Sequence, residues 1–211
     1  MSDNNDNKKE DKGKKFEIFC GILMALFGAF LVVVQLMGDN NNETRLKAQN
    51  KATSTYAWFN AKGIKQNLIE GERDTLKSLL LAGIIPNDKR AAVKKHIQTL
   101  EKKIKKYKKE KTEILLGSKK VGKANWVQDI DGEFGKVIGA KEWDEMIELT
   151  DKVDNIFDFA TLFMQLALII GAISLIFKRP VMKWAFFVIM IALNAVGGTY
   201  AIIAASYGTG F

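Results

Sequence analysis

Polar side chains inside apolar stretches are the residues of this chain that could do chemistry. Asp158 and Gln165 lie in the apolar stretch 156–177, and Asn194 lies in the stretch 181–207. Within a bilayer such groups need water, an ion or a hydrogen-bond partner. Asp158 falls within one helical turn of the end of its stretch, so we expect it to reach water at an interface. Gln165 and Asn194 lie deeper, and we expect bonds to a neighbouring helix, worth ~0.6–2 kcal/mol each.

Other reactive residue types are scarce. His96 is the only histidine and Cys20 the only cysteine, which excludes a His/Cys metal site and a disulfide within one chain. The segment 129–133 (Asp-Ile-Asp-Gly-Glu) has only part of the spacing of a calcium loop, and it predicts an acidic turn. No recognisable set of catalytic residues occurs elsewhere. We therefore expect a protein that is not an enzyme and that uses no cofactor or metal.

The elements that position the polar groups follow from hydropathy. Three apolar stretches, 16–38, 156–177 and 181–207, are each long enough to cross about 30 Å of hydrocarbon as a helix. Only residues 178–180 (Lys-Arg-Pro) separate the second from the third, so these two stretches predict a transmembrane hairpin. The first stretch is too long for the apolar core of a signal peptide and lacks an Ala-x-Ala exit. It therefore predicts an uncleaved anchor.

The remainder of the chain is polar. Residues 1–15 lack aromatic side chains and periodicity, which predicts a disordered tail. Residues 39–42 (Asp-Asn-Asn-Asn) are expected to break the first helix or to cap the next one. Good helix formers from residue 43 to about residue 82 predict one or two helices, with a bend near Gly71. We therefore expect an all-α membrane protein with three transmembrane helices and an extramembrane helical domain, residues 39–155, between the first and second.

The extramembrane domain contains the clearest periodicity of the chain. Its apolar residues recur at alternating steps of four and three, as in the seam of a coiled coil. The seam consists of Val93, Ile97, Leu100, Ile104 and Tyr107. A helix over residues 87–116 must bury this seam. Its partner is either the preceding helix, in an antiparallel hairpin, or the same helix of another subunit.

Seven lysines surround the seam between residues 102 and 111. A basic run can bind nucleic acid or anionic lipid. Here Tyr107 is the only interleaved aromatic residue, and the lysines do not form a single stripe. We expect a solvated coiled-coil face and no nucleic-acid partner, and binding of anionic lipid is the alternative.

Small residues recur at helical spacing in the apolar stretches, which lets two helices approach closely. The residues that we expect at such contacts are Gly171, Gly197, Ala201 and Ala205. Their spacing fits packing within the hairpin or packing between subunits.

Lysine and arginine near the ends of the apolar stretches predict the orientation in the membrane. Eight of them lie before the first stretch or around the hairpin turn, against five at the opposite ends. This distribution places the N-terminus and the hairpin turn in the cytoplasm. Residues 39–155 then lie on the other side, which in a bacterium is the periplasm.

The segment 56–66 (Tyr-Ala-Trp-Phe-Asn-Ala-Lys-Gly-Ile-Lys-Gln) resembles the signature of an uncharacterised bacterial membrane family catalogued as domain of unknown function 4337. Residues 157–160 (Phe-Asp-Phe-Ala) are similar to the family's entry into its terminal hairpin. Asn60 stands where the family usually has Gln, and Tyr56 where Trp is expected. The resemblance covers most of residues 16–205 and implies one span, a helical segment bearing aromatics, and a terminal transmembrane hairpin. It also implies a bacterial inner membrane, and no particular activity.

These patterns favour a structural function. We expect a homo-oligomeric scaffold, or an accessory subunit bound to an unidentified membrane protein, surrounded by membrane lipids. The expected contact surface, besides the seam, is Tyr56, Trp58, Phe59, Lys62 and Lys65, although the same residues also fit a core between two packed helices. An oligomeric channel lined by polar span residues is the first alternative function. A membrane sensor or anionic-lipid binder that uses the lysine-rich helix is the second.

Overall fold

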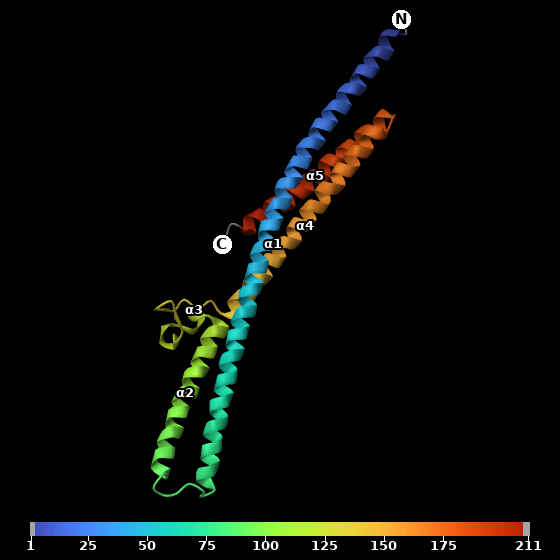
Figure 1. Ribbon diagram of the computed structural model, residues 1–211. Coiled ribbons are helices and arrows are strands. Elements are labelled where there is room, and N and C mark those ends of the chain that lie inside the picture. The colour runs from blue at the N-terminus through green and yellow to red at the C-terminus, as the bar shows by residue number, and fades with distance from the viewer. Residues whose placement is uncertain (1–2, 209–211) are drawn as a thin grey trace. The chain divides into compact units, whose positions relative to one another are not determined.

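The structure is a computed structural model that describes residues 3–208, with side chains described from residue 13 to residue 207 (Figure 1). Its elements are α1 (Asp3–Leu81), α2 (Arg90–Leu116), α3 (Ser118–Val121), the 3-10 helix η1 (Lys123–Asn125), β1 (Asp129–Ile130), β2 (Glu133–Phe134), α4 (Ala140–Ile176) and α5 (Pro180–Gly208). The prediction of an all-helical chain is confirmed, apart from one short antiparallel strand pair. The chain divides into two units, one made of the residues up to Arg45 and from Leu149 onward, the other of residues 46–148.

The first unit, called the apolar bundle below, packs α4 and α5 against the N-terminal part of α1 (Figure 1). The buried face of α4 follows steps of four and three: Val153, Phe157, Ala160, Met164 and Ala167. The buried face of α5 does the same: Phe187, Met190, Asn194, Gly197 and Ala201. Cys20, Leu31 and Val34 complete the core from α1. This spacing keeps one face of each helix against its neighbours at a shallow crossing angle.

Glycines allow the close approach of α4 and α5. A Cβ on Gly197 would come within 2.6 Å of Met164 Cγ, and a Cβ on Gly171 would collide with Met190 Sδ. Ala201 is also buried, whereas Ala205 is only half-buried. The small residues that the sequence singles out thus lie at contacts between helices of the same chain.

The outer faces of the apolar bundle carry exposed large apolar side chains. Leu26 on α1, Ile169 on α4 and Ile202 on α5 are examples, and each exposes more than half of its surface. Three helices are long and apolar enough to cross a membrane. The prediction of three such helices is confirmed at this level of length and composition.

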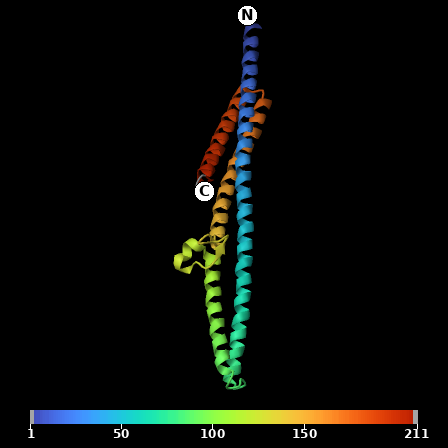
Figure 2. The same ribbon diagram turned by 60° about the vertical axis from the view of Figure 1, so that its left-hand side comes forward.

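The second unit, called the hairpin domain below, pairs residues 46–81 of α1 with the antiparallel helix α2 (Figure 2). Ile97, Leu100 and Ile104 are buried, and Val93 and Tyr107 are half-buried. Ion pairs between the two helices include Lys77 Nζ to Glu101 Oε1 at 2.7 Å. Of the two partners that the sequence leaves open for the seam, the preceding helix of the same chain covers it.

One ion pair is buried inside this hairpin. Lys62 Nζ lies 2.6 Å from Glu110 Oε2, and Glu110 is only 4% exposed. Lys62 Nζ also lies 5.7 Å from the centre of the Tyr107 ring. Because sliding one helix by a turn would separate Glu110 from Lys62 and leave it only the more distant Lys106 of its own helix, at 3.7 Å, this pair favours a single register.

Residues 117–139 fold around the buried carboxylate of Glu113. Ser118 Oγ donates to Glu113 Oε1 at 2.8 Å, and the backbone N–H groups of Val127 and Gln128 donate to Oε2 at 2.8 and 2.9 Å. Trp126 Nε1 donates to the Ser118 carbonyl at 2.8 Å. The segment therefore has little regular secondary structure, but these hydrogen bonds give it a defined conformation.

Glycine is required where this segment turns most sharply. Gly135 has φ 84°, and a Cβ there would come within 2.6 Å of the Trp126 ring. Between β1 and β2, Asp129 Oδ1 accepts a hydrogen bond from Gly132 N at 2.6 Å. Residues 129–133 thus form an acidic turn.

α1 continues through residues 39–42, so the predicted break there is wrong. The polar side chains find partners that leave the helical backbone intact: Asn41 Nδ2 donates to the Thr150 carbonyl of α4 at 3.0 Å, and Thr44 Oγ1 donates to the Asn40 carbonyl at 3.1 Å. Residues 141–155 and the second apolar stretch likewise form one helix, α4.

Two further boundaries of the helices differ from expectation. α1 already begins at Asp3, within the segment whose composition predicts a disordered tail, because its lysines and glutamate are compatible with extending the helix of the apolar stretch. The helix is also uninterrupted at Gly71. α2 begins at Arg90 rather than residue 87 because residues 82–89 form the connecting turn.

Candidate functional site

The candidate site lies in the apolar bundle, at the end where α1 and α4 become polar. Leu31, Val34 and Gly38 occupy successive positions of α1 that face α4; a Cβ on Gly38 would lie 3.5 Å from Phe157. The next positions of the same three–four repeat are Asn41 and Arg45. Helix geometry therefore turns these two polar side chains toward α4.

Arg45 is the centre of a polar clamp between α1 and α4. Its Nη1 lies 3.1 Å from Asp151 Oδ1, and its Nε lies 3.3 Å from Asp154 Oδ2. Its Nη2 donates to Asn42 Oδ1 at 2.8 Å, and Asn41 Nδ2 donates to Asp154 Oδ1. Two carboxylates and an amide oxygen thus surround the guanidinium, and charge-assisted bonds of this kind are roughly twice as strong as neutral ones.

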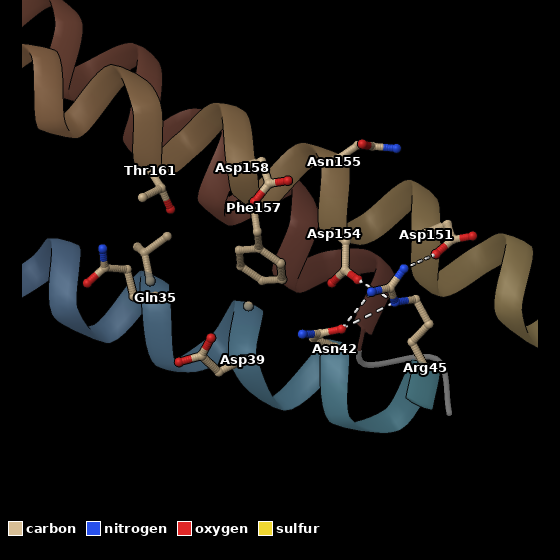
Figure 3. Close-up of a pocket in the computed structure, with 12 residues that line it drawn as sticks. Gln35, Asp39, Asn42, Arg45, Asp151, Asp154, Asn155, Phe157, Asp158 and Thr161 are labelled. Atoms are coloured by element: carbon tan, nitrogen blue, oxygen red, sulfur yellow. Dashed lines mark hydrogen bonds and ion pairs between the residues drawn. The ribbon is translucent and has the colours of Figure 1, made fainter. Parts of the chain in front are cut away.

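A pocket of about 530 Å³ lies beside the clamp (Figure 3). It is lined by four residues of the clamp, Asn42, Arg45, Asp151 and Asp154, and by others that include Gln35, Asp39, Phe157, Asp158 and Thr161. Figure 3 shows Asp39 on α1 and Asp158 on α4, on either side of the Phe157 ring. Among the described residues, neither of these two carboxylates has an ion pair or a hydrogen bond.

The pocket is acidic. Arg45 is the one cationic residue in its lining, and Asp151 and Asp154 already neutralise it. Asp39 and Asp158 therefore give the pocket a negative potential that attracts cations and orients water. In the part of the chain that the structure describes, no three His, Cys, Asp or Glu side chains are grouped to hold a metal ion. The site thus consists of a polar clamp between α1 and α4 and an acidic pocket beside it.

The three polar residues of the apolar stretches occupy different environments. Asp158 is exposed and lines the pocket. Gln165 is exposed on the outer face of α4, and no hydrogen bond from the described residues reaches it. Asn194 is 5% exposed inside the bundle, and its Nδ2 has no partner within the described chain. The structure therefore does not bring the three together.

The aromatic and basic residues expected at a contact surface lie mostly inside the hairpin domain. Lys111 Nζ lies 4.9 Å from the centre of the Phe59 ring, and Lys62 pairs with Glu110 as described above. Tyr56 and Trp58 are half-buried, and Lys65 is exposed. Phe59 and Lys62 thus contact α2, whereas Tyr56 bonds to Asp144 of α4.

Hydrogen bonds shift the pKa values of four groups of the hairpin domain, namely Tyr56, Arg73, Asp74 and Glu101. Tyr56 Oη donates to Asp144 Oδ2 at 2.5 Å, and this bond raises the pKa of Tyr56 because the carboxylate favours the protonated phenol. The bond from Lys77 lowers the pKa of Glu101, and the bond from Arg73 lowers the pKa of Asp74. These groups lie on the surface of the hairpin.

Sequence reasoning missed the clamp. Asn41, Arg45, Asp151 and Asp154 stand outside the apolar stretches, where hydropathy assigns them to a solvated connection. The signal that could have found them is the three–four repeat of α1, which continues past Gly38 and places Asn41 and Arg45 at positions that face a neighbouring helix.

The chain is helical apart from one short strand pair, and a polar clamp closes the end of its apolar bundle. Its class is therefore that of helical proteins with three helices apolar enough to cross a membrane. The model of the family described as Domain of unknown function (DUF4337) matches residues 16–207, and the chain belongs to this family. The resemblance carried by residues 56–66 and 157–160 is thereby confirmed. No protein of curated function and no solved structure matches the chain.

Proposed function

We propose that this chain is a non-enzymatic integral membrane protein that assembles laterally with another membrane chain, a second copy of itself in the first instance. In this proposal α1, α4 and α5 span a bacterial inner membrane, and the hairpin domain lies outside it. The exposed apolar faces of the bundle support insertion, since soluble proteins rarely expose continuous apolar surfaces of this size.

Gln165 is the observation that carries the assembly. It lies in the middle of the apolar part of α4 and is exposed, with Leu162 and Ile169 exposed beside it on the same face. In hydrocarbon no water can satisfy its amide, so another chain must supply the hydrogen-bond partner. The symmetric contact of Gln165 with Gln165 across a two-fold axis satisfies both amides at once.

A packing interface fits this face better than a pore does. The exposed neighbours of Gln165 on this face, Leu162 and Ile169, are apolar, whereas a water-filled path needs a row of polar groups. Thr161 and Asp158 are the next polar residues of α4 before Gln165, and both line the acidic pocket at the end of the stretch. We therefore place the channel second to a scaffold or an accessory subunit.

Native mass spectrometry of the full chain, extracted in a mild detergent or in nanodiscs, tests the proposal. We expect a discrete oligomer for the unmodified chain and a shift toward monomer for Gln165→Leu. Thr199→Val is the matched control, because Thr199 Oγ1 already donates to the Ala195 carbonyl of its own helix at 2.8 Å. It should retain the oligomer.

Three results bear on the alternatives. A stoichiometric unrelated protein in the same particle makes the chain an accessory subunit. A lone monomer of the unmodified chain overturns lateral assembly. An oligomer that Gln165→Leu leaves intact removes Gln165 from the interface.

A further inference from the structure

The net charge of the chain lies entirely in the hairpin domain. Residues 46–148 contain 22 of the 32 basic residues and 14 of the 24 acidic residues, which accounts for the whole net charge of +8. Within it, α2 holds ten basic residues and three acidic ones, and two of those three, Glu110 and Glu113, are buried. The outward side of α2 is therefore almost free of negative charge.

Four lysines form what we call the cationic face of α2. Lys95, Lys102 and Lys109 follow one another at steps of seven residues, opposite the buried seam, and Lys105 lies beside them. At about 1.5 Å per residue, the face extends over roughly 21 Å. All four are exposed, and among the described residues none has an ion pair or hydrogen bond.

Unlike the four lysines of the cationic face, other lysines of α2 do have acidic partners. Lys106 and Lys108, on the sides of α2 nearer α1, reach Glu110 and Glu70 at 3.7 and 3.8 Å. Glu110 of α2 and Glu70 of α1 are thus paired with lysines along the flanks of the hairpin. Of the four lysines of the cationic face, only Lys105 has an acid nearby, Glu101 of α2, which already pairs with Lys77, so most of the charge of the face is open to a partner outside the chain.

The composition of the face indicates which partner fits. No arginine lies among the four lysines, and the one aromatic residue between them in the sequence, Tyr107, is half-buried in the seam, so the face offers neither stacking for bases nor bidentate forks for phosphate. Its intervening outward residues, such as Gln98 and Thr99, are polar, so the face has nothing to insert into hydrocarbon. Point charges spread along a flat helix surface suit a plane of diffuse negative charge.

We propose that the cationic face of α2 docks on the surface of a bilayer that contains anionic phospholipid. Each lysine near such a surface contributes about 1 kcal/mol, falling off within a Debye length. Attachment of the chain to a membrane, which is part of the proposed function, keeps the face at a high effective concentration of lipid. The docking is electrostatic and superficial, and it reverses with salt.

The test uses the full chain in nanodiscs of neutral lipid, mixed with separate vesicles of phosphatidylcholine that contain or lack phosphatidylglycerol. Co-flotation measures binding. We expect binding to the anionic vesicles alone, weakening as salt rises. Replacing Lys95, Lys102, Lys105 and Lys109 together by Gln should reduce the affinity by about tenfold or more. Far-UV circular dichroism checks that this variant keeps its helices.

The matched control replaces four other exposed lysines of the hairpin domain by Gln. These are Lys51, Lys65, Lys119 and Lys123, which are likewise without a partner among the described residues. The total charge changes by the same amount, so this variant should bind nearly as well as the unmodified chain. An equal loss of affinity in both variants would show that net charge, and not this face, attracts the lipid.

Other outcomes overturn the proposal directly. Equal binding to neutral vesicles, or binding that salt does not weaken, contradicts an electrostatic docking surface. A duplex oligonucleotide that displaces the vesicles at equal phosphate concentration would assign the face to nucleic acid instead. The Gln165→Leu variant should bind vesicles normally, so a failure of lateral assembly can be distinguished from a failure of lipid binding. Failure to enter nanodiscs would count against membrane insertion alone.

Discussion

At the scale of single residues, Glu113 does most to give residues 117–139 a defined structure. Its side chain is fully buried, and its two oxygens accept one hydroxyl and two backbone N–H groups. Without the carboxylate, these donors would be buried with no acceptor, which typically costs about 1–3 kcal/mol for each group. One acidic residue at the end of α2 therefore organises the turns that follow it.

Glu113→Gln tests this role with almost no change in volume. The amide NH₂ group cannot accept, so at least one of the three donors loses its acceptor. We expect a loss of about 2–3 kcal/mol and faster hydrogen exchange over residues 118–137, measured by mass spectrometry. Glu133→Gln is the control, since Glu133 is exposed and pairs only with Lys136. Unchanged protection in Glu113→Gln would mean that the glycine turns hold the segment by themselves.

The sequence identifies polar residues in apolar stretches but not where their side chains point. Asp158, Gln165 and Asn194 stand out by type, yet one lines a pocket, one faces outward and one is buried. The difference depends on which face of each helix packs inward, and that is a property of the bundle. The sequence does not single out Glu113, because the groups that donate hydrogen bonds to its carboxylate lie up to 15 residues away along the chain.

At the scale of elements, the clamp ties α1 to α4 just beyond their apolar parts. Arg45→Ala leaves Asp151 and Asp154 close together without their cation. Since the site is partly exposed, we expect a loss of about 1–2 kcal/mol, measured by thermal unfolding in detergent and by hydrogen exchange over residues 39–45 and 149–158. Arg73→Ala is the control, because the only described ion pair of Arg73 is with its neighbour Asp74.

If Arg45→Ala unfolds at the same temperature as Arg73→Ala, with equal exchange in both segments, the apolar contacts alone hold α1 against α4. If the exchange rises only in residues 39–45, the clamp orders α1 locally without joining the helices.

The hairpin should lose stability in acid through two surface carboxylates. Bonds from Lys77 and Arg73 hold the pKa values of Glu101 and Asp74 below their usual range of about 4. A lowered folded-state pKa means that the contribution is present above this range and is lost as pH falls through the lowered values. The combined variant Glu101→Gln with Asp74→Asn should therefore show a flatter dependence on acid pH in urea unfolding followed by circular dichroism.

Both carboxylates are exposed, so solvent screens them and the effect is small. Lys77→Gln offers a second check, because it removes only the bond to Glu101 and should flatten part of the same curve. An acid slope identical in all three proteins would contradict the assignment.

Elements could be predicted where a local pattern determines them. Hydropathy locates the three apolar helices, and the three–four repeat locates α2 and its seam. The break expected at residues 39–42 failed because Asn41 bonds to α4, and a contact between residues 109 positions apart has no local signature. The sequence likewise could not decide which helix covers the seam of α2, because that contact also joins residues far apart along the chain.

At the scale of the whole molecule, charge and apolarity are separated between the two units. The apolar bundle contains ten basic and ten acidic residues over the full sequence, and the hairpin domain carries the excess of lysine. Such a separation suits a protein with one part in hydrocarbon and one in water. In the proposed function, the side of the membrane on which the hairpin domain lies would decide which partners the cationic face can meet.

The three membrane crossings of the proposed function would place the ends of the apolar helices on defined sides. If α1, α4 and α5 each cross the membrane once, as proposed, the turn at Lys178 lies on the side of the N-terminus and the hairpin domain on the other. The excess of lysine and arginine at the N-terminal side predicts that this side is cytoplasmic. Single-cysteine variants in a Cys20→Ser background test it. In intact bacterial cells, Lys65→Cys should react with a membrane-impermeant maleimide, and Lys178→Cys should react only after the inner membrane is permeabilised. The reverse pattern would place the hairpin domain in the cytoplasm, and equal reactivity of both sites in intact cells would contradict three crossings.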